Sequence, residues 1–194
     1  MNKTKIDWAT MSWNPVTGCR HGCPYCYARR TATRFNAGLE DPAPLAGGLH
    51  VLPEKIKAAP YPYGFEPTLH RYRLGQPQNT KEPQTVFVCS MADLFGRWVP
   101  TSWILEVLDA CAATGAVFEV NTGGMFRGYC GEPYPSRFLL EALRKSGARV
   151  TVNADAHCTE AVRFRFDETL ALLRDIGFTA VTVLEDGMFV EKPL

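Results

Sequence analysis

The sequence predicts an α/β fold with a parallel sheet, and two observations lead to this expectation. From residue 85 to the end, β-branched apolar runs alternate with amphipathic runs, and the connections between them are short. Alternation of strands and helices in this way is typical of βαβ units. We expect about five or six strands in the chain, after a long loop-rich N-terminal region.

Local residue patterns mark each expected element. The expected strands are 85–91, 116–121, 148–157 and 179–194, the last with a turn at Asp186–Gly187. The expected helices are 101–115, 136–147 and 166–178, and the first of them begins at Thr101 or Ser102 and stops at Gly115. Residues 37–84 contain many of the prolines and glycines, which predicts long loops around short helices.

Composition narrows the class of protein. The 194 residues are 46% hydrophobic and 21% charged, as in a globular domain, and the net charge of +1 gives no support for binding to nucleic acid. The chain has neither a secretory signal nor an apolar run long enough to span a membrane, so we expect a cytoplasmic protein without membrane contact. Of the seven cysteines, three lie within eight residues, which favours metal binding over disulfides.

The three clustered cysteines, Cys19, Cys23 and Cys26, are separated by three and then two residues. Three thiolates from one tight loop can hold a 4Fe–4S cluster and leave one iron open for another ligand. Two alternatives remain open for this cluster of cysteines. One is a zinc site with His21 as the fourth ligand, and the other is a set of reduced structural cysteines.

The surrounding sequence adds a resemblance. The blocks WNPVTGCRHGCPYCYARR, FEPTLHRYRL and VFVCSMADLFGRWVP resemble a phage-type family of radical S-adenosylmethionine-like proteins over about residues 4–112. The resemblance implies that S-adenosylmethionine binds at the open iron and is cleaved to generate a radical, on a substrate that the sequence does not name. It also implies cofactor contacts at Tyr25, Ser90 and Asp93, although Ser90 and Asp93 could simply form a turn or a helix cap. Cys89 is expected to be a buried strand residue.

A second candidate site follows the third expected strand. Asp155 and His157 stand two residues apart, so on a strand both side chains would point the same way, as metal binding requires. The segments EVNTGG, EPYPS and DAH resemble the C-terminal part of PHP-family histidinol phosphatases over about residues 108–194. That resemblance implies Asp155 and His157 as ligands of divalent metals (Mn, Zn or Fe), and Asn121 and Arg127 as contacts for the substrate phosphate. The family's other ligands have no counterpart here, so a hydrogen-bonded pair without metal is the alternative for Asp155 and His157.

The two resemblances describe a composite chain, with a radical-type segment at 1–112 and a PHP-like segment at 113–194, possibly joined in one domain. Both families build barrel-like βα folds, which implies a partial (β/α) barrel-like open sheet. Its exposed edge could pair in a homodimer. Three hypotheses follow: a cluster-binding radical-type protein, a truncated and inactive phosphoesterase, or a non-enzymatic fusion product.

Overall fold

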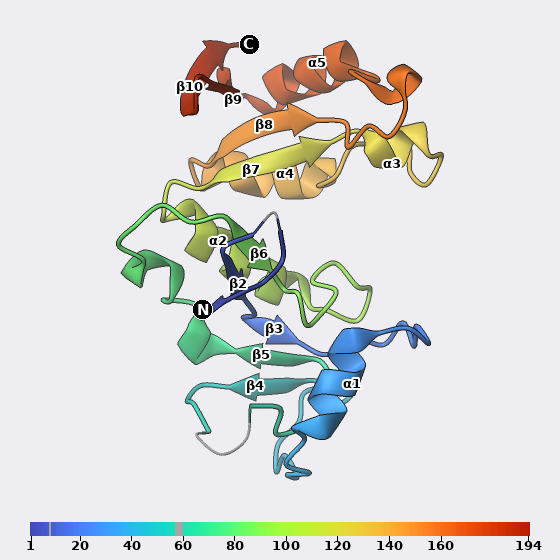
Figure 1. Cartoon of the computed structure of the whole chain (residues 1–194), viewed down its shortest axis with the longest axis vertical. Coiled ribbons are helices and arrows are strands. Elements are labelled where there is room, and N and C mark those ends of the chain that lie inside the picture. The colour runs from blue at the N-terminus through green and yellow to red at the C-terminus, as the bar shows by residue number, and fades with distance from the viewer. Residues whose placement is uncertain (8, 57–59) are drawn as a thin grey trace. The chain divides into compact units, whose positions relative to one another are not determined.

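The computed structural model describes residues 1–7, 9–56 and 60–194 of the chain (Figure 1). It contains two compact units, Met1–Ala110 and Cys111–Leu194, and the boundary between them falls inside helix α2 (Thr101–Ala112). Each unit contains both helices and strands. The fold is therefore mixed α/β, as the sequence predicts.

The first sheet of the N-terminal unit joins the start of the chain to its middle. Strand β2 (Met11–Trp13) lies between β1 (Asn2–Lys3), which is antiparallel to it, and β6 (Val86–Val88), which is parallel. Trp13 is fully buried, and its indole nitrogen donates a hydrogen bond to the Arg73 carbonyl at 2.9 Å. This sheet fixes the loop that follows β6.

The second sheet of this unit holds the chain on either side of the cysteine loop. Strand β5 (Thr68–His70) pairs antiparallel with β3 (Val16–Thr17) and parallel with β4 (His50–Leu52). His70 is completely buried and lies 2.8 Å from the Thr17 hydroxyl. Burial, with a smaller contribution from Arg73, lowers the pKa of His70 to about 3, so this imidazole is neutral in the folded protein at pH 7.

The expectation of loops and short helices at 37–84 is wrong in part. Strands β4 and β5 lie within this range, together with the 3₁₀ turns η1 (Arg71–Arg73) and η2 (Pro77–Asn79). Each strand has only three residues, so the alternation that identifies a strand has no room to appear in the sequence. Residues 57–59 lie outside the described part of this region.

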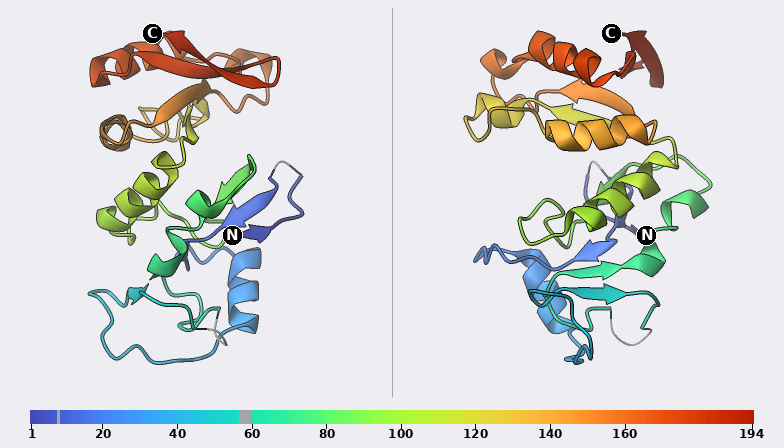
Figure 2. Two further views of the ribbon diagram at one scale, coloured as in Figure 1. Left: turned by 90° about the vertical axis from the view of Figure 1, so that its left-hand side faces the viewer. Right: turned by 180° about the vertical axis from the view of Figure 1, so that it is seen from behind.

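The C-terminal unit has longer strands than the N-terminal unit. Strands β7 (Val117–Asn121) and β8 (Arg149–Asn153) pair in parallel, and the unit also contains helices α4 (Arg137–Lys145) and α5 (Phe166–Ile176) (Figure 2). An ion pair of 2.6 Å joins Arg137 of α4 to Asp175 of α5. Between β7 and α4 lies a short helix, α3 (Gly123–Phe126), and the 3₁₀ turn η3 (Thr159–Ala161) precedes α5. The core of this unit consists of buried apolar residues from these strands and helices: Val120, Leu140, Leu143, Val150 and Leu173.

The unit ends in a hairpin. Strands β9 (Ala180–Glu185) and β10 (Met188–Pro193) are antiparallel and are joined at Asp186 and Gly187. Both linking residues have positive φ, 49° and 77°, as the two-residue turns that match the twist of a hairpin require. The turn predicted at this position is confirmed.

The expected barrel-like open sheet is not observed. The described strands form four separate small sheets, two in each unit, and these sheets include antiparallel pairs. No closed barrel occurs in the described part of the chain. A physical reason is the shortness of the N-terminal strands, because strands of two or three residues form too few ladder hydrogen bonds to continue a large sheet. No helix in residues 1–7, 9–56 or 60–194 has the length and apolarity that a membrane span requires.

Candidate functional sites

The cysteine loop runs between β3 and α1 (Tyr27–Arg34), and its first residue requires glycine. Gly18 has φ +89°, and its N–H donates to the Met91 carbonyl at 2.9 Å. A Cβ atom at this position would lie 2.3 Å from the Glu66 carbonyl oxygen. Because no side chain fits there, Gly18 holds the start of the loop against neighbouring backbone.

Hydrogen bonds tie the three cysteines to one another and to α1. The Cys26 N–H donates to the Cys23 carbonyl at 3.2 Å, and the Arg29 guanidinium donates to the Cys19 carbonyl at 3.0 Å. The Cys26 Sγ accepts the Arg29 N–H at 3.3 Å and so caps the first turn of the helix. The N-terminus of a helix favours negative charge, which suits a thiolate at this position. All three thiols are free of disulfides and half-buried.

Ser90 and Asp93 lie beside this loop, after β6. The Tyr27 hydroxyl donates to the Ser90 carbonyl at 2.7 Å, and His21 Nε2 lies 2.7 Å from Asp93 Oδ2. Both side chains also have structural partners. Ser90 Oγ donates to Asn14 Oδ1 at 3.2 Å, and Asp93 Oδ1 accepts the Phe95 N–H at 3.1 Å. The fold therefore brings the two residues to the cysteine loop, while the turn interpretation also fits their contacts.

The contacts of His21 and of the three cysteines bear on both metal-binding interpretations of this loop. Among the described residues, no three His, Cys, Asp or Glu side chains are placed to hold one ion. His21, the fourth ligand of the alternative zinc site, pairs with Asp93 and packs edge-on against Trp98 with ring centroids 4.8 Å apart. A 4Fe–4S cluster has a different requirement, because each thiolate binds its own iron. Three free thiols on one loop fit that donor set.

The second candidate site differs from its sequence prediction in one respect. Strand β8 ends at Asn153, so Asp155 and His157 lie in the following loop. Asp155 has φ +49°, and His157 Nδ1 lies 2.8 Å from the Asp155 backbone oxygen. The expectation that strand alternation aligns the two side chains is therefore wrong, because the strand has already ended. The loop, not the pleat of the strand, determines where they point.

Three of the four predicted residues nevertheless share one cavity. Arg127 Nη1 and Asp155 Oδ2 are 3.6 Å apart, a loose and partly exposed pair, and both residues line a cavity of about 350 Å³ together with His157. The full lining is Phe126, Arg127, Ala154, Asp155, His157, Cys158 and Ala161. The cavity offers one guanidinium for an anion. It does not offer a complete set of metal ligands among the described side chains.

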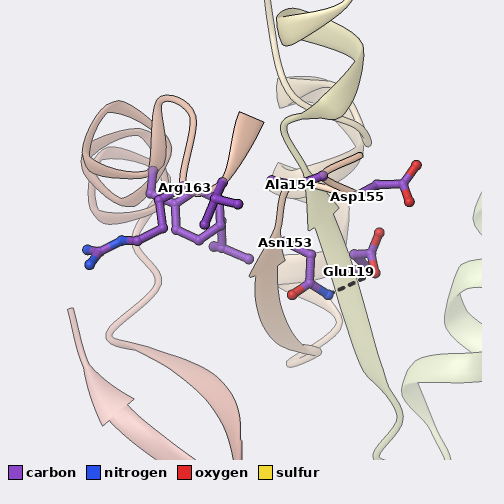
Figure 3. Close-up of a pocket in the computed structure, with 9 residues that line it drawn as sticks. Glu119, Asn153, Ala154, Asp155 and Arg163 are labelled. Atoms are coloured by element: carbon purple, nitrogen blue, oxygen red, sulfur yellow. Dashed lines mark hydrogen bonds between the residues drawn. The ribbon is translucent and has the colours of Figure 1, made fainter. Parts of the chain in front are cut away.

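A second cavity of about 410 Å³ lies against the same loop and shares Asp155 with the first (Figure 3). Its lining includes Glu119 and Asn153, and the Asn153 amide donates to Glu119 Oε2 at 2.9 Å. In Figure 3 the Arg163 side chain extends to the side opposite from Glu119 and Asp155. Asn121 does not line this cavity; its amide donates to Glu119 Oε1 at 2.6 Å, and its Oδ1 accepts the Gly123 N–H at 2.8 Å.

Sequence reasoning missed Glu119, Asn153 and Arg163. The sequence holds a signal for Glu119, because it is a charged residue within the apolar strand VFEVN. It stands two residues before Asn121, so the two polar side chains share one face of the strand. The β7–β8 register places Asn121 opposite Asn153, which brings the amide of Asn153 within reach of Glu119. Only the pairing of the two strands reveals this contact.

The N-terminal part of the chain matches a known family. Residues 3–122 fit the model of a family described as "Protein of unknown function (DUF5131)". The match covers more than half of the 194 residues. That description names neither a cofactor nor an activity, so the iron–sulfur cluster stays a prediction.

Part of the chain is also similar to two curated proteins, each named "Probable histidinol-phosphatase". The protein from Deinococcus radiodurans is 34% identical over 89 residues, which is 45% of this chain and 34% of that protein. The protein from Schizosaccharomyces pombe is 30% identical over 73 residues, which is 38% of this chain and 24% of that protein. The chain thus spans about a third and about a quarter of the length of these relatives. This weak, partial similarity supports the PHP-like part of the chain.

Proposed function

The chain belongs to the DUF5131 family, whose function is unknown, and we propose that its N-terminal unit binds a 4Fe–4S cluster through Cys19, Cys23 and Cys26. The observation that carries this proposal is the loop itself: three free, half-buried thiols lie within eight residues, and the last one caps α1. These three thiolates would hold the cluster and leave one iron open; after reduction by an external one-electron donor, it would supply the electron for cleavage of the sulfonium of S-adenosylmethionine.

The chain's own residues would organise this site. Gly18 lets the loop approach the backbone at Glu66, and Arg29 fixes the Cys19 carbonyl. In this proposal the side chains that hold S-adenosylmethionine are Ser90 and Asp93, beside the cysteines, and the exposed Tyr25, which precedes Cys26. His21, within the same loop, lies with its Nε2 2.7 Å from Asp93 Oδ2. We assign no substrate to the reaction on this basis.

Anaerobic reconstitution of the full chain with iron and sulfide tests the proposal. We expect charge-transfer absorption and, after reduction, an electron paramagnetic resonance signal that changes when S-adenosylmethionine is added. Cys23→Ala should lose the cluster. The matched control is Cys111→Ala, because burial raises the pKa of the Cys111 thiol to about 12 and it lies in α2 outside the loop. Absence of a cluster in the unsubstituted protein, or an unchanged cluster in Cys23→Ala, contradicts the proposal.

The similarity to the two histidinol phosphatases favours a second candidate function for the C-terminal unit. We propose that the cavity at Arg127, Asp155 and His157 keeps affinity for a phosphate group, with Arg127 as the main contact, since a guanidinium matches phosphate geometry. Two potential metal ligands, Asp155 and His157, do not assemble the multinuclear centre that hydrolysis needs. We therefore propose that this site binds phosphate without hydrolysing a phosphate ester. If neither this site nor the cysteine loop binds its ligand, the third hypothesis, a non-enzymatic fusion product, is the one that stands.

Two measurements test the second candidate. Titration calorimetry with inorganic phosphate should give weak binding that is lost in Arg127→Ala and kept in Arg174→Ala, an exposed arginine on α5. Incubation with manganese or zinc and histidinol phosphate should release no more phosphate than the Asp155→Ala variant does. Binding that survives in Arg127→Ala rejects the phosphate contact, and release that depends on Asp155 rejects the proposal of an inactive site.

A further inference from the structure

Helix α1 presents an unusual outer face directly after the last cysteine. Ala28 and Ala32 are its buried residues, four positions apart, so the helix packs inward through small side chains. Tyr27, Arg30 and Arg34 stand at positions i, i+3 and i+7 and are all exposed. Residues with this spacing lie on one face of a helix. We call these three residues and Phe35, which ends the helix, the α1 stripe.

The stripe carries two arginines in a stretch of sequence that contains no acidic residue. The sequence contains no Asp or Glu between Asp7 and Glu40. Arg20 and Arg29, also in this stretch, already bind Glu66 and the Cys19 carbonyl. Within the described part of the chain, neither Arg30 nor Arg34 forms an ion pair. The net charge of the whole chain is only +1, but the exposed face of α1 is basic.

Aromatic rings accompany the two arginines. Tyr27 is 53% exposed and Phe35 is 51% exposed, and the Arg34 guanidinium lies 5.4 Å from the centroid of the Phe35 ring. Phe95 is 56% exposed, two residues beyond Asp93, whose side chain pairs with His21 of the cysteine loop. Arginines that meet phosphates and exposed rings that stack on bases are the two features that single-stranded nucleic acids require. An acidic peptide would use the charge but not the rings.

We propose that the α1 stripe binds single-stranded nucleic acid, with Arg30 and Arg34 on the phosphates and Phe35 against a base. The two arginines are about 6 Å apart along the helix axis, a spacing that can meet successive phosphates. The stripe starts one residue after Cys26, so a strand bound there passes the cysteine loop. The binding of the strand does not depend on the proposed cluster. Only the idea that the strand is also the substrate of the cysteine site rests on that proposal.

The test uses the full chain and fluorescein-labelled single-stranded oligouridine and oligothymidine, with binding followed by fluorescence anisotropy. Arg30→Glu/Arg34→Glu should weaken binding by about tenfold or more and reduce the slope of log affinity against log salt by about 1.4. Phe35→Ala should weaken it by about fivefold. The matched control, Lys145→Glu/Arg174→Glu, makes the same change in charge on exposed residues of the C-terminal unit and should bind like the unsubstituted protein.

A second measurement on the same samples tells failure of the α1 stripe apart from failure of the proposed cluster. The same samples are reconstituted, and the double charge reversal should keep the cluster absorption while it loses the oligonucleotide. No binding by the unsubstituted protein at low salt, or equal binding by Arg30→Glu/Arg34→Glu, overturns the stripe whatever the cluster spectrum shows. Equal competition by polyglutamate or by anionic vesicles also overturns it, because charge alone would then explain the affinity. A preference between the ribose and deoxyribose oligonucleotides identifies which strand is bound.

Discussion

The two units of the chain place their candidate groups in opposite ways. In the N-terminal unit the strands are short, yet the three cysteines lie on one continuous loop. In the C-terminal unit the strands are longer, yet the candidate ligands Asp155 and His157 have no third metal-binding side chain beside them among the described residues. A site encoded within a few residues needs only its own loop. A site assembled from several strands depends on the pairing of those strands.

The prediction with the largest expected effect concerns the apolar core of the C-terminal unit, compared with that of the N-terminal unit. Leu140 in α4 is fully buried, and Leu140→Ala should lower the free energy of unfolding by about 2–5 kcal/mol because it leaves a cavity. Leu69→Ala is the matched change at a fully buried position of the N-terminal unit. Urea unfolding followed by circular dichroism measures both. A loss below about 1 kcal/mol for Leu140→Ala would contradict the packing described for α4.

The next prediction concerns the cysteine loop. Gly18→Ala should cost about 3 kcal/mol or more, since it combines a left-handed backbone with a Cβ atom 2.3 Å from the Glu66 oxygen. Gly22→Ala shares the positive φ but has no atom within 4 Å of the added Cβ, so it should cost only about 1–2 kcal/mol. Thermal unfolding compares the two variants. Equal losses would mean that the close approach at Gly18 is unimportant.

A third prediction uses the buried imidazole of the N-terminal unit. The pKa of His70 is lowered to about 3 by burial, below the ordinary value of 6.5, so the unfolded chain binds a proton that the folded chain does not. The stability of the folded state is therefore fully present above pH 6.5 and falls as the pH decreases toward 3. Between pH 6.5 and 5, His70 should account for about 2 kcal/mol of this loss.

Denaturant titrations at several pH values test this prediction. His70→Gln should show a shallower decrease in stability with acid than the unsubstituted protein, even though it loses stability at pH 7 together with the contact to Thr17. His157→Gln is the control, because His157 is exposed in the C-terminal unit. An identical pH dependence for His70→Gln and the unsubstituted protein would exclude His70 as the source.

The smallest effect concerns the surface of the C-terminal unit. Arg137 forms ion pairs with Glu141 and Asp175 on α4 and α5, but all three side chains are well exposed. Arg137→Ala should therefore lower the stability only slightly, and by less than the substitutions above. Unfolding at low and high salt provides the check, and a large loss that persists in high salt would show that the pairs matter more than their exposure suggests.

The longer helices and strands are predicted correctly from the sequence, and most of the shorter ones are not. Helices α2, α4 and α5, strands β7 and β8, and the Asp186–Gly187 turn lie where the patterns predict them, because each has a period or a turn signal long enough to recognise. Helix α1 was not predicted because its exposed faces are polar and its buried residues are only two alanines. The strand pairs of the N-terminal unit join residues up to 75 positions apart in sequence, as between Met11 and Val86, and no local pattern encodes such a contact.

The candidate sites show the same limit. The spacing of the cysteines is visible in the sequence, whereas the Gly18 contact with Glu66 that shapes their loop is not. Arg127, Asp155 and His157 line one cavity, and Asp155 reaches it through a left-handed loop conformation and not through strand alternation. The contact of Glu119 with Asn153 depends on the register of two strands that are separated in sequence by α3 and α4.

The β9–β10 hairpin has a consequence for the order of folding. Its partners are close in sequence, since Glu185 faces Met188 across a two-residue turn, whereas β7 and β8 bring together residues such as Val117 and Arg149. A hairpin of this kind forms in about 1–10 μs, and a pair with distant partners must first close a long loop. We therefore expect β9 and β10 to pair before β7 and β8 do when the chain refolds.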